Sequence, residues 1–93
     1  MTDMKHIVKR KGHSEVYDVR KLYASVYSMC LATQATDEEA EHTADKIVDY
    51  VNMWLKKKHE VTAHDIQLVT SRYLTNLNAD AGYLYSKHRG MHQ

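Results

Sequence analysis

The chain of 93 residues contains no proline and only three glycines, so no stretch has the composition of a flexible linker. It also lacks low-complexity tracts and internal repeats. A chain of this length buries roughly 60 to 65% of the surface that it exposes when unfolded, which suffices for one hydrophobic core. The sequence therefore predicts a single small domain over residues 1–93.

Two segments have the apolar spacing of amphipathic helices, each behind a polar residue that can cap its start. The first covers residues 19–32 after Asp18. The second lies within residues 35–59, with Thr36 and Glu39 in the positions of a capping box. The residues expected to face the core are Leu22, Val26, Met29 and Cys30 in the first helix, and Ala40, Ala44, Ile47, Val51 and Leu55 in the second.

The last third of the chain continues this helical pattern. Thr62 and Asp65 can cap a helix over residues 62–78 reciprocally, and Asn78 can cap a final helix within residues 79–92. In the helix that Thr62 begins, the residues expected to face inward are Ile66, Val69, Tyr73 and Leu77.

The N-terminal segments "KHIVKR" and "SEVYD" contain β-branched and aromatic residues and are separated by "KGH", whose Gly12 can adopt the positive φ of a tight turn. This pattern predicts a β-hairpin, and "HEV" before Thr62 could add a short third strand. An isolated two-stranded ribbon is marginal in water, so the hairpin should cover the helices. The predicted fold is α+β: a small four-helix bundle capped by an N-terminal β-hairpin plus a short third strand.

Three basic residues can meet where the hairpin returns into the first helix. Lys9 and Arg10 end the first predicted strand, and Lys21 lies in the first helical turn, where unpaired N–H groups favour an anion. Converging cations at a helix start form a candidate phosphate site. The formal net charge of +1 is too close to zero to indicate nucleic-acid binding by itself.

The stretch "VKRKGHSEVYDVRKL" resembles the opening motif of the ATP-cone domain, and "EVTAHDIQLV" and "AGYLYSKHR" resemble its later segments. The resemblance covers nearly the whole chain. It implies a regulatory domain that binds ATP or dATP, alone or with magnesium, as an allosteric effector. It also implies that the domain is not an enzyme.

The resemblance further implies a nucleotide-binding set. In it Lys9, Arg10 and Lys21 hold phosphates, while the hairpin backbone frames the nucleotide. The full set is Val8, Lys9, Arg10, Gly12, Glu15, Asp18, Lys21, Leu22, Thr62 and Lys87, with Ile66, Gln67, His88 and Arg89 as approximate further counterparts. Each of three residues could instead have a purely structural role. Asp18 could serve solely as the helix cap, Glu15 solely as a cross-strand partner, and Gly12 solely as a turn residue.

ATP-cones usually accompany a ribonucleotide reductase large subunit or a four-cysteine zinc ribbon, and this sequence has neither. We therefore expect a cone standing alone, or a fragment, that acts through its own oligomerisation or through a reductase or transcription-regulator partner. Tyr50, Trp54 and Tyr85 are candidate interface residues. The first residues carry no secretion signal, so a cytoplasmic location is expected.

Other classes of function have weaker support. A nucleic-acid-binding module could use the patch Lys5, Lys9, Arg10, Lys11, Arg20 and Lys21, although the even charge and acidic second helix argue against it. A structural interaction domain with a degenerate pocket is a third interpretation. His88 and His92 have ligand spacing but no third partner for zinc. Cys30 lies on an apolar helix face, so we interpret it as a small buried hydrophobic residue rather than a reactive thiol.

Overall fold

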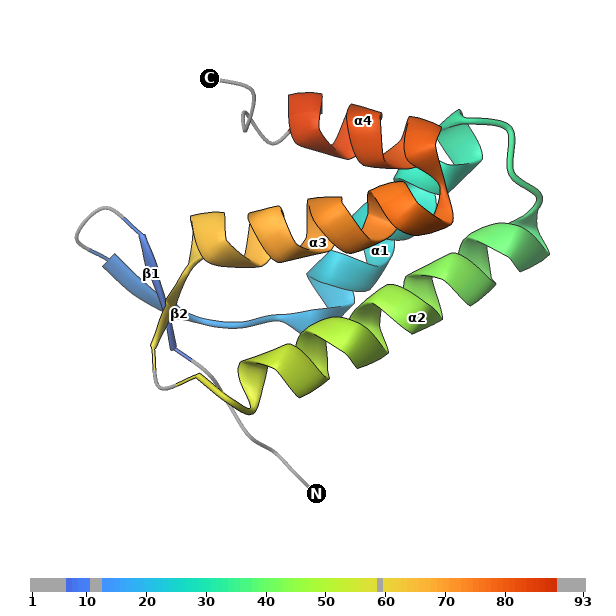
Figure 1. The fold of residues 1–93 in the computed structure, drawn as a ribbon. Coiled ribbons are helices and arrows are strands. Elements are labelled where there is room, and N and C mark those ends of the chain that lie inside the picture. Colours follow the sequence, from blue (N-terminus) through green and yellow to red (C-terminus); the bar gives the residue numbers. More distant parts are fainter. Residues whose placement is uncertain (1–6, 11–12, 59, 89–93) are drawn as a thin grey trace.

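The structure is a computed structural model that describes residues 7–10, 13–58 and 60–88, with the backbone alone at 7–10, 13–16 and 88. The elements in chain order are β1 (Ile7–Arg10), β2 (His13–Val16), α1 (Val19–Ala32), α2 (Asp37–Leu55), β3 (Val61–Thr62), α3 (Ala63–Leu77) and α4 (Ala79–His88). Figure 1 shows the strands at one end of the helices. The domain is therefore mostly helical and of the α+β class, as predicted.

The four helices form a closed cycle of neighbours. α1 packs on α2, α2 on α3, α3 on α4, and α4 returns to α1 (Figure 1). The core lies between them, and every residue expected to face inward from α2 is buried. In α1, Leu22, Val26 and Cys30 are buried as predicted, whereas Met29 is partly buried at the edge of the core.

Each predicted capping residue lies at the start of its helix. Thr36 Oγ1 accepts from the Glu39 N–H at 3.1 Å, and the Thr36 N–H donates to Glu39 Oε1 at 2.9 Å. Asn78 Oδ1 accepts from the Ala81 N–H at the start of α4. Because such side chains satisfy N–H groups that have no partner within the helix, they determine where helices begin in a chain without proline.

The set of α3 residues that face the core differs from the sequence prediction, which was wrong for part of this helix. Leu77 is 37% exposed and Val69 and Tyr73 are only partly buried, whereas Ile66, Thr70, Ser71 and Leu74 are buried. The cause is polar packing between α3 and α4, where Ser71 Oγ and Ser86 Oγ share a hydrogen bond of 2.6 Å. Apolar spacing alone cannot detect a buried face that includes hydroxyl groups.

The strands form a sheet in the order β2-β1-β3. β1 pairs with β2 in antiparallel fashion and with β3 in parallel fashion. β2 leads into α1 and β3 leads into α3, so the sheet is connected to the starts of two helices (Figure 1).

Candidate nucleotide-binding site

The sheet brings the first motif of the predicted nucleotide-binding set next to Thr62. In the register of β1 with β3, Lys9 is paired with Thr62 and Val8 with Val61. On the other edge of β1, Val8 is paired with Glu15. Of the other predicted residues in this region, Arg10 ends β1 and Gly12 lies outside the described residues.

The start of α1 follows β2, and Asp18 accepts hydrogen bonds from three N–H groups of its first turn. Asp18 Oδ1 accepts from the Arg20 N–H at 3.0 Å. The carbonyl oxygen of Asp18 accepts from the N–H groups of Lys21 and Leu22 at 3.2 and 3.3 Å. A carboxylate in this position also contributes negative charge. Any anion bound here would therefore depend on side-chain cations more than on the helix N–H groups that the sequence analysis invoked.

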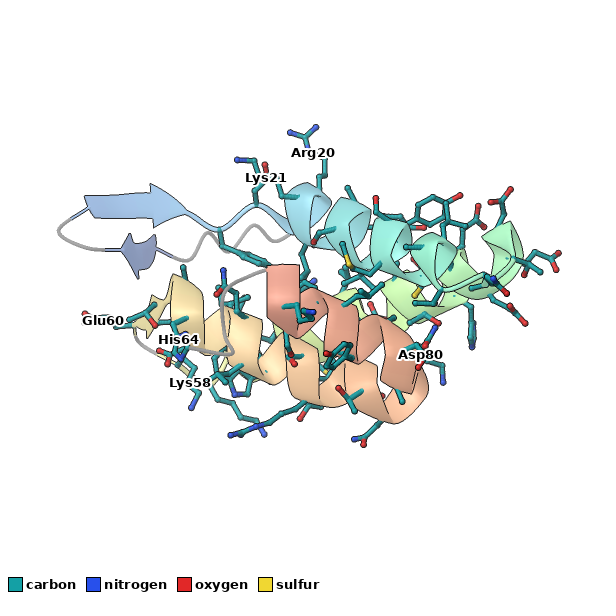
Figure 2. The ribbon with its side chains drawn as sticks, turned by 90° about the horizontal axis from the view of Figure 1, so that it is seen from above. Arg20, Lys21, Lys58, Glu60, His64 and Asp80 are labelled. Carbon is teal, nitrogen blue, oxygen red and sulfur yellow. The ribbon has the colours of Figure 1, made fainter. Side chains whose placement is uncertain are left out.

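Lys21 supplies one such cation. Its side chain is exposed, and Figure 2 shows both Arg20 and Lys21 projecting outward from the start of α1. Arg20 differs from Lys21 in having a described ion pair, because its Nε lies 3.8 Å from Asp18 Oδ1. Leu22, by contrast, is only 6% exposed and belongs to the core, so its described role is to anchor this turn.

Thr62 combines two structural roles. It is the register partner of Lys9 in the sheet, and it is the N-cap of α3. Its Oγ1 accepts from the Asp65 N–H at 3.0 Å, and Asp65 Oδ2 accepts from the Thr62 N–H at 3.0 Å. Because a hydroxyl can accept and donate at once, the exposed Thr62 side chain still has a proton to offer.

Lys87 lies in the last turn of α4, which runs back toward the end of the bundle where α3 begins (Figure 1). Its side chain is exposed, and its Nζ lies 5.4 Å from the centre of the Tyr83 ring. Of the approximate counterparts, Ile66 is buried and Gln67 is partly buried in the first turns of α3. The side chain of His88 and the whole of Arg89 lie outside the described residues.

Tyr17 is a residue of this region that sequence analysis did not select. It packs against the core between β2 and α1, and its buried hydroxyl has no hydrogen-bond partner among the described residues. Burial, reinforced by the nearby Tyr85 and Asp18, raises the pKa of Tyr17 to about 12. Tyr17 belongs to the recognised motif, but nothing in its spacing indicates an unpaired hydroxyl.

Other kinds of site find little support in the part of the chain that the structure describes. No group of three or more histidine, cysteine, aspartate or glutamate residues there could hold a metal ion. Cys30 is fully buried, and burial raises the pKa of its thiol, as expected of a small core residue. Among the same residues, no helix is both long and apolar enough to cross a membrane.

The arrangement defines a small α+β domain in which a three-stranded sheet joins the N-terminal hairpin to the segment before α3, with an exposed lysine in the first turn of α1. The family model of the ATP cone domain matches residues 5–89. The chain therefore belongs to the ATP-cone family, whose domain is a nucleotide-binding regulatory domain and is not catalytic by itself. Searches of curated proteins and of solved structures gave no significant match.

Proposed function

We propose that this domain is an allosteric sensor of adenine nucleotides that binds ATP or dATP beside β1 and the start of α1. The observation that carries the proposal is the family match over nearly the whole chain. The register pairing of Lys9 with Thr62 supports the location, because it joins the first motif to the start of α3. Residues 1–93 act as one domain in this proposal.

In this site Lys9, Arg10 and Lys21 hold the phosphates. The reason is electrostatic. Asp18 accepts from the N–H groups of Arg20, Lys21 and Leu22 and adds negative charge, so the phosphates need cationic side chains. Magnesium bound to the nucleotide would reduce the charge that these residues must balance. Val8, Gly12 and Glu15 line the nucleotide from the hairpin, and Thr62 and Lys87 complete the site from α3 and α4.

The output of the sensor is a change in association. A ligand shifts an equilibrium only through its different affinity for the two states, so ATP and dATP should favour different assemblies. The partner is a second copy of the chain, a ribonucleotide reductase or a transcription regulator, in the cytoplasm.

Calorimetric titration of ATP, dATP and GTP tests the binding step. Lys21→Ala should weaken adenine-nucleotide binding by about one to two powers of ten, because a charge-assisted contact contributes about 1.5 to 3 kcal/mol. Arg20→Ala is the matched control, since Arg20 is the adjacent exposed cation and lies outside the proposed site. Equal losses in both variants would indicate a general charge effect.

The same titration with a DNA duplex separates the proposal from a nucleic-acid-binding module. Adenine nucleotides should bind and the duplex should not. Duplex binding that falls steeply with salt, without nucleotide binding, would favour the basic-patch interpretation. Binding of neither would leave an interaction domain with a degenerate pocket.

A further inference from the structure

A groove of about 340 Å³ runs between α2 and α3, which pack side by side (Figure 1). Its α2 wall contains Tyr50 and Trp54. Its α3 wall is one stripe of the helix, because each member lies three or four residues from another. The members of the stripe are Asp65, Leu68, Val69, Arg72, Tyr73 and Asn76. Among the described residues, none of those predicted to bind nucleotide lines the groove, so it is a separate surface of the domain.

The groove has the length of a short extended peptide. Asp65 and Asn76 mark the two ends of its α3 wall, and at 1.5 Å per residue they lie about 16 Å apart along the helix axis. An extended chain advances about 3.3 Å per residue, so about five residues cover this distance. Asn76 is exposed, and its amide can both donate to and accept from a peptide backbone.

The middle of the groove is aromatic. The rings of Tyr50 and Tyr73 stack with their centres 4.2 Å apart, and Trp54 lies one helical turn further along α2. Tyr50 is 41% exposed, so part of this aromatic surface is open to a partner. Tyrosine, tryptophan and arginine are the residues that most often dominate binding at protein interfaces, and all three line this groove.

The charges of the groove favour a carboxylate. Arg72 is exposed and has no ion pair with another described residue. Lys58 adds a second cation, because its Nζ lies 5.0 Å from the centre of the Trp54 ring. The acidic residue of the α3 wall, Asp65, already accepts from the Thr62 N–H in the cap of α3. A ligand with a negative charge therefore complements this surface.

The α2 residues beside the groove strengthen this charge preference. Lys46 is exposed and precedes Tyr50 by four residues, so the two share one side of the helix. Asp49 is also exposed, but as the neighbour of Tyr50 in the sequence it points about 100° away from it. The α2 edge of the groove is therefore basic.

We infer that the α2–α3 groove binds a short extended segment of another protein, in which an aromatic or long aliphatic side chain is followed or preceded by a carboxylate. The apolar side chain lies against Tyr50 and Trp54, where it leaves water. The carboxylate pairs with Arg72, whose guanidinium can donate two parallel hydrogen bonds. A free small molecule would leave most of the groove uncovered. The inference goes beyond the proposed nucleotide site, because it gives the sensor a surface for a partner and requires no nucleotide.

Titration followed by the fluorescence of Trp54 tests the inference, because Trp54 is the single tryptophan of the chain and lines the groove. The probe is the blocked pentapeptide Glu-Ser-Phe-Ser-Glu, whose larger side chains point to one side of an extended backbone. It should cause a saturable change without nucleotide. The same peptide with lysine in place of glutamate should bind at least about tenfold more weakly. No saturable change up to about 1 mM, or equal binding of the two peptides, would overturn the inference.

A charge reversal tests the role of Arg72. Arg72→Glu should weaken binding of the glutamate peptide at least about tenfold and should bind the lysine peptide more tightly than the unaltered chain does. Arg20→Glu is the matched control, because Arg20 is an exposed arginine at the start of α1 and does not line the groove. It should leave both titrations unchanged. Circular dichroism checks that each variant is folded, and equal losses in the two variants would contradict a specific carboxylate site.

Three further measurements separate this inference from other occupants and from the proposed function. If N-acetylphenylalanine binds as tightly as the pentapeptide, the groove is a small-molecule site and the inference is wrong. It is also wrong if the chain alone sediments as a dimer that Arg72→Glu dissociates, since the occupant is then a second copy. Calorimetry of the unaltered chain with ATP completes the set. Binding of ATP but not of the peptide contradicts only this inference, and binding of the peptide but not of ATP contradicts only the nucleotide site.

Discussion

Lys9 and Thr62 are register partners in the parallel pairing of β1 with β3, although they lie far apart in the sequence. Thr62 also caps α3 through its reciprocal hydrogen bonds with Asp65. The position of β1 relative to α3 is therefore linked to a single threonine, and a change at Thr62 should affect both stability and ligand binding.

The first prediction separates these two effects. Thr62→Ala should lower the free energy of unfolding by about 1 kcal/mol, because the N-cap is lost, and should also weaken ATP binding. Thr36→Ala is the matched control: it removes the equivalent capping box of α2, away from the sheet. It should show a similar loss in urea denaturation and unchanged affinity in calorimetry. If both variants bind ATP normally, Thr62 has only its capping role.

The second prediction concerns the unpaired hydroxyl of Tyr17. Tyr17→Phe removes a buried oxygen that has no described partner while keeping the ring in the core. Because an unsatisfied buried polar group costs about 1 to 3 kcal/mol, the variant should be at least as stable as the unaltered chain, with a melting temperature a few degrees higher. A clear loss of stability would show that the hydroxyl has a partner.

The third prediction uses the pKa of the same residue. The Tyr17 pKa is raised to about 12 from its ordinary value of 10.0. Between these values the phenol ionises in the unfolded chain but keeps its proton in the folded one. The free energy of unfolding should therefore be fully retained below about pH 10 and decline as pH rises toward 12. Denaturation series at pH 8 to 11.5 should show a smaller decline for Tyr17→Phe. Equal declines would mean that other groups, such as Tyr23 and Tyr27, dominate.

The fourth prediction concerns the crossing of α3 and α4. A Cβ atom on Gly82 would meet the side chain of Thr75 and lie 2.6 Å from its Cα. Backbone cannot move aside as a flexible side chain can, so Gly82→Ala should destabilise the chain by about 1 to 3 kcal/mol despite the better helix propensity of alanine. Thr75→Ala tests the cause: it removes the hydroxyl that the Cβ atom would meet, but it should recover little in the double variant, because the clash with the Thr75 backbone remains.

The fifth prediction concerns the end of α1. Gln34 has a φ of 73°, and the N–H groups of Gln34 and Ala35 bond to the carbonyl oxygens of Leu31 and Cys30. This is the left-handed helix end at which glycine is preferred. Gln34→Gly should therefore stabilise the chain by about 0.5 to 1 kcal/mol in urea denaturation. Gln34→Ala should bring no such gain.

Helix starts could be predicted from sequence because their causes are local. Asp18, Thr36, Thr62 and Asn78 each bond to N–H groups within three residues, and α1 begins and ends where the spacing indicated. The packing of α3 against α4 has a distant cause, the contact of Ser71 with Ser86, and was not predicted.

Only part of the candidate site could likewise be predicted from the sequence. The motif around Asp18 could be recognised in the sequence. The hydrogen bonds from the α1 N–H groups to Asp18, which leave fewer of these groups for an anion, are seen only in the structure. Tyr85 was expected to be available for an interface and is instead buried in the core, near Tyr17. Tyr50 fits the expectation better, since it remains exposed beside the α2–α3 groove.

The central place of β1 in the sheet has a consequence for how the chain folds. Helices α1 and α2 are neighbours in sequence, as are α3 and α4, so each pair can form with short loops to close. The pairing of β1 with β3 joins residues 8 and 9 to residues 61 and 62 and so closes a much longer loop. We expect helical pairs to form early and Lys9 to meet Thr62 last. A nucleotide that requires both residues would then bind only the completely folded chain, and its affinity would report on the folding of the whole domain.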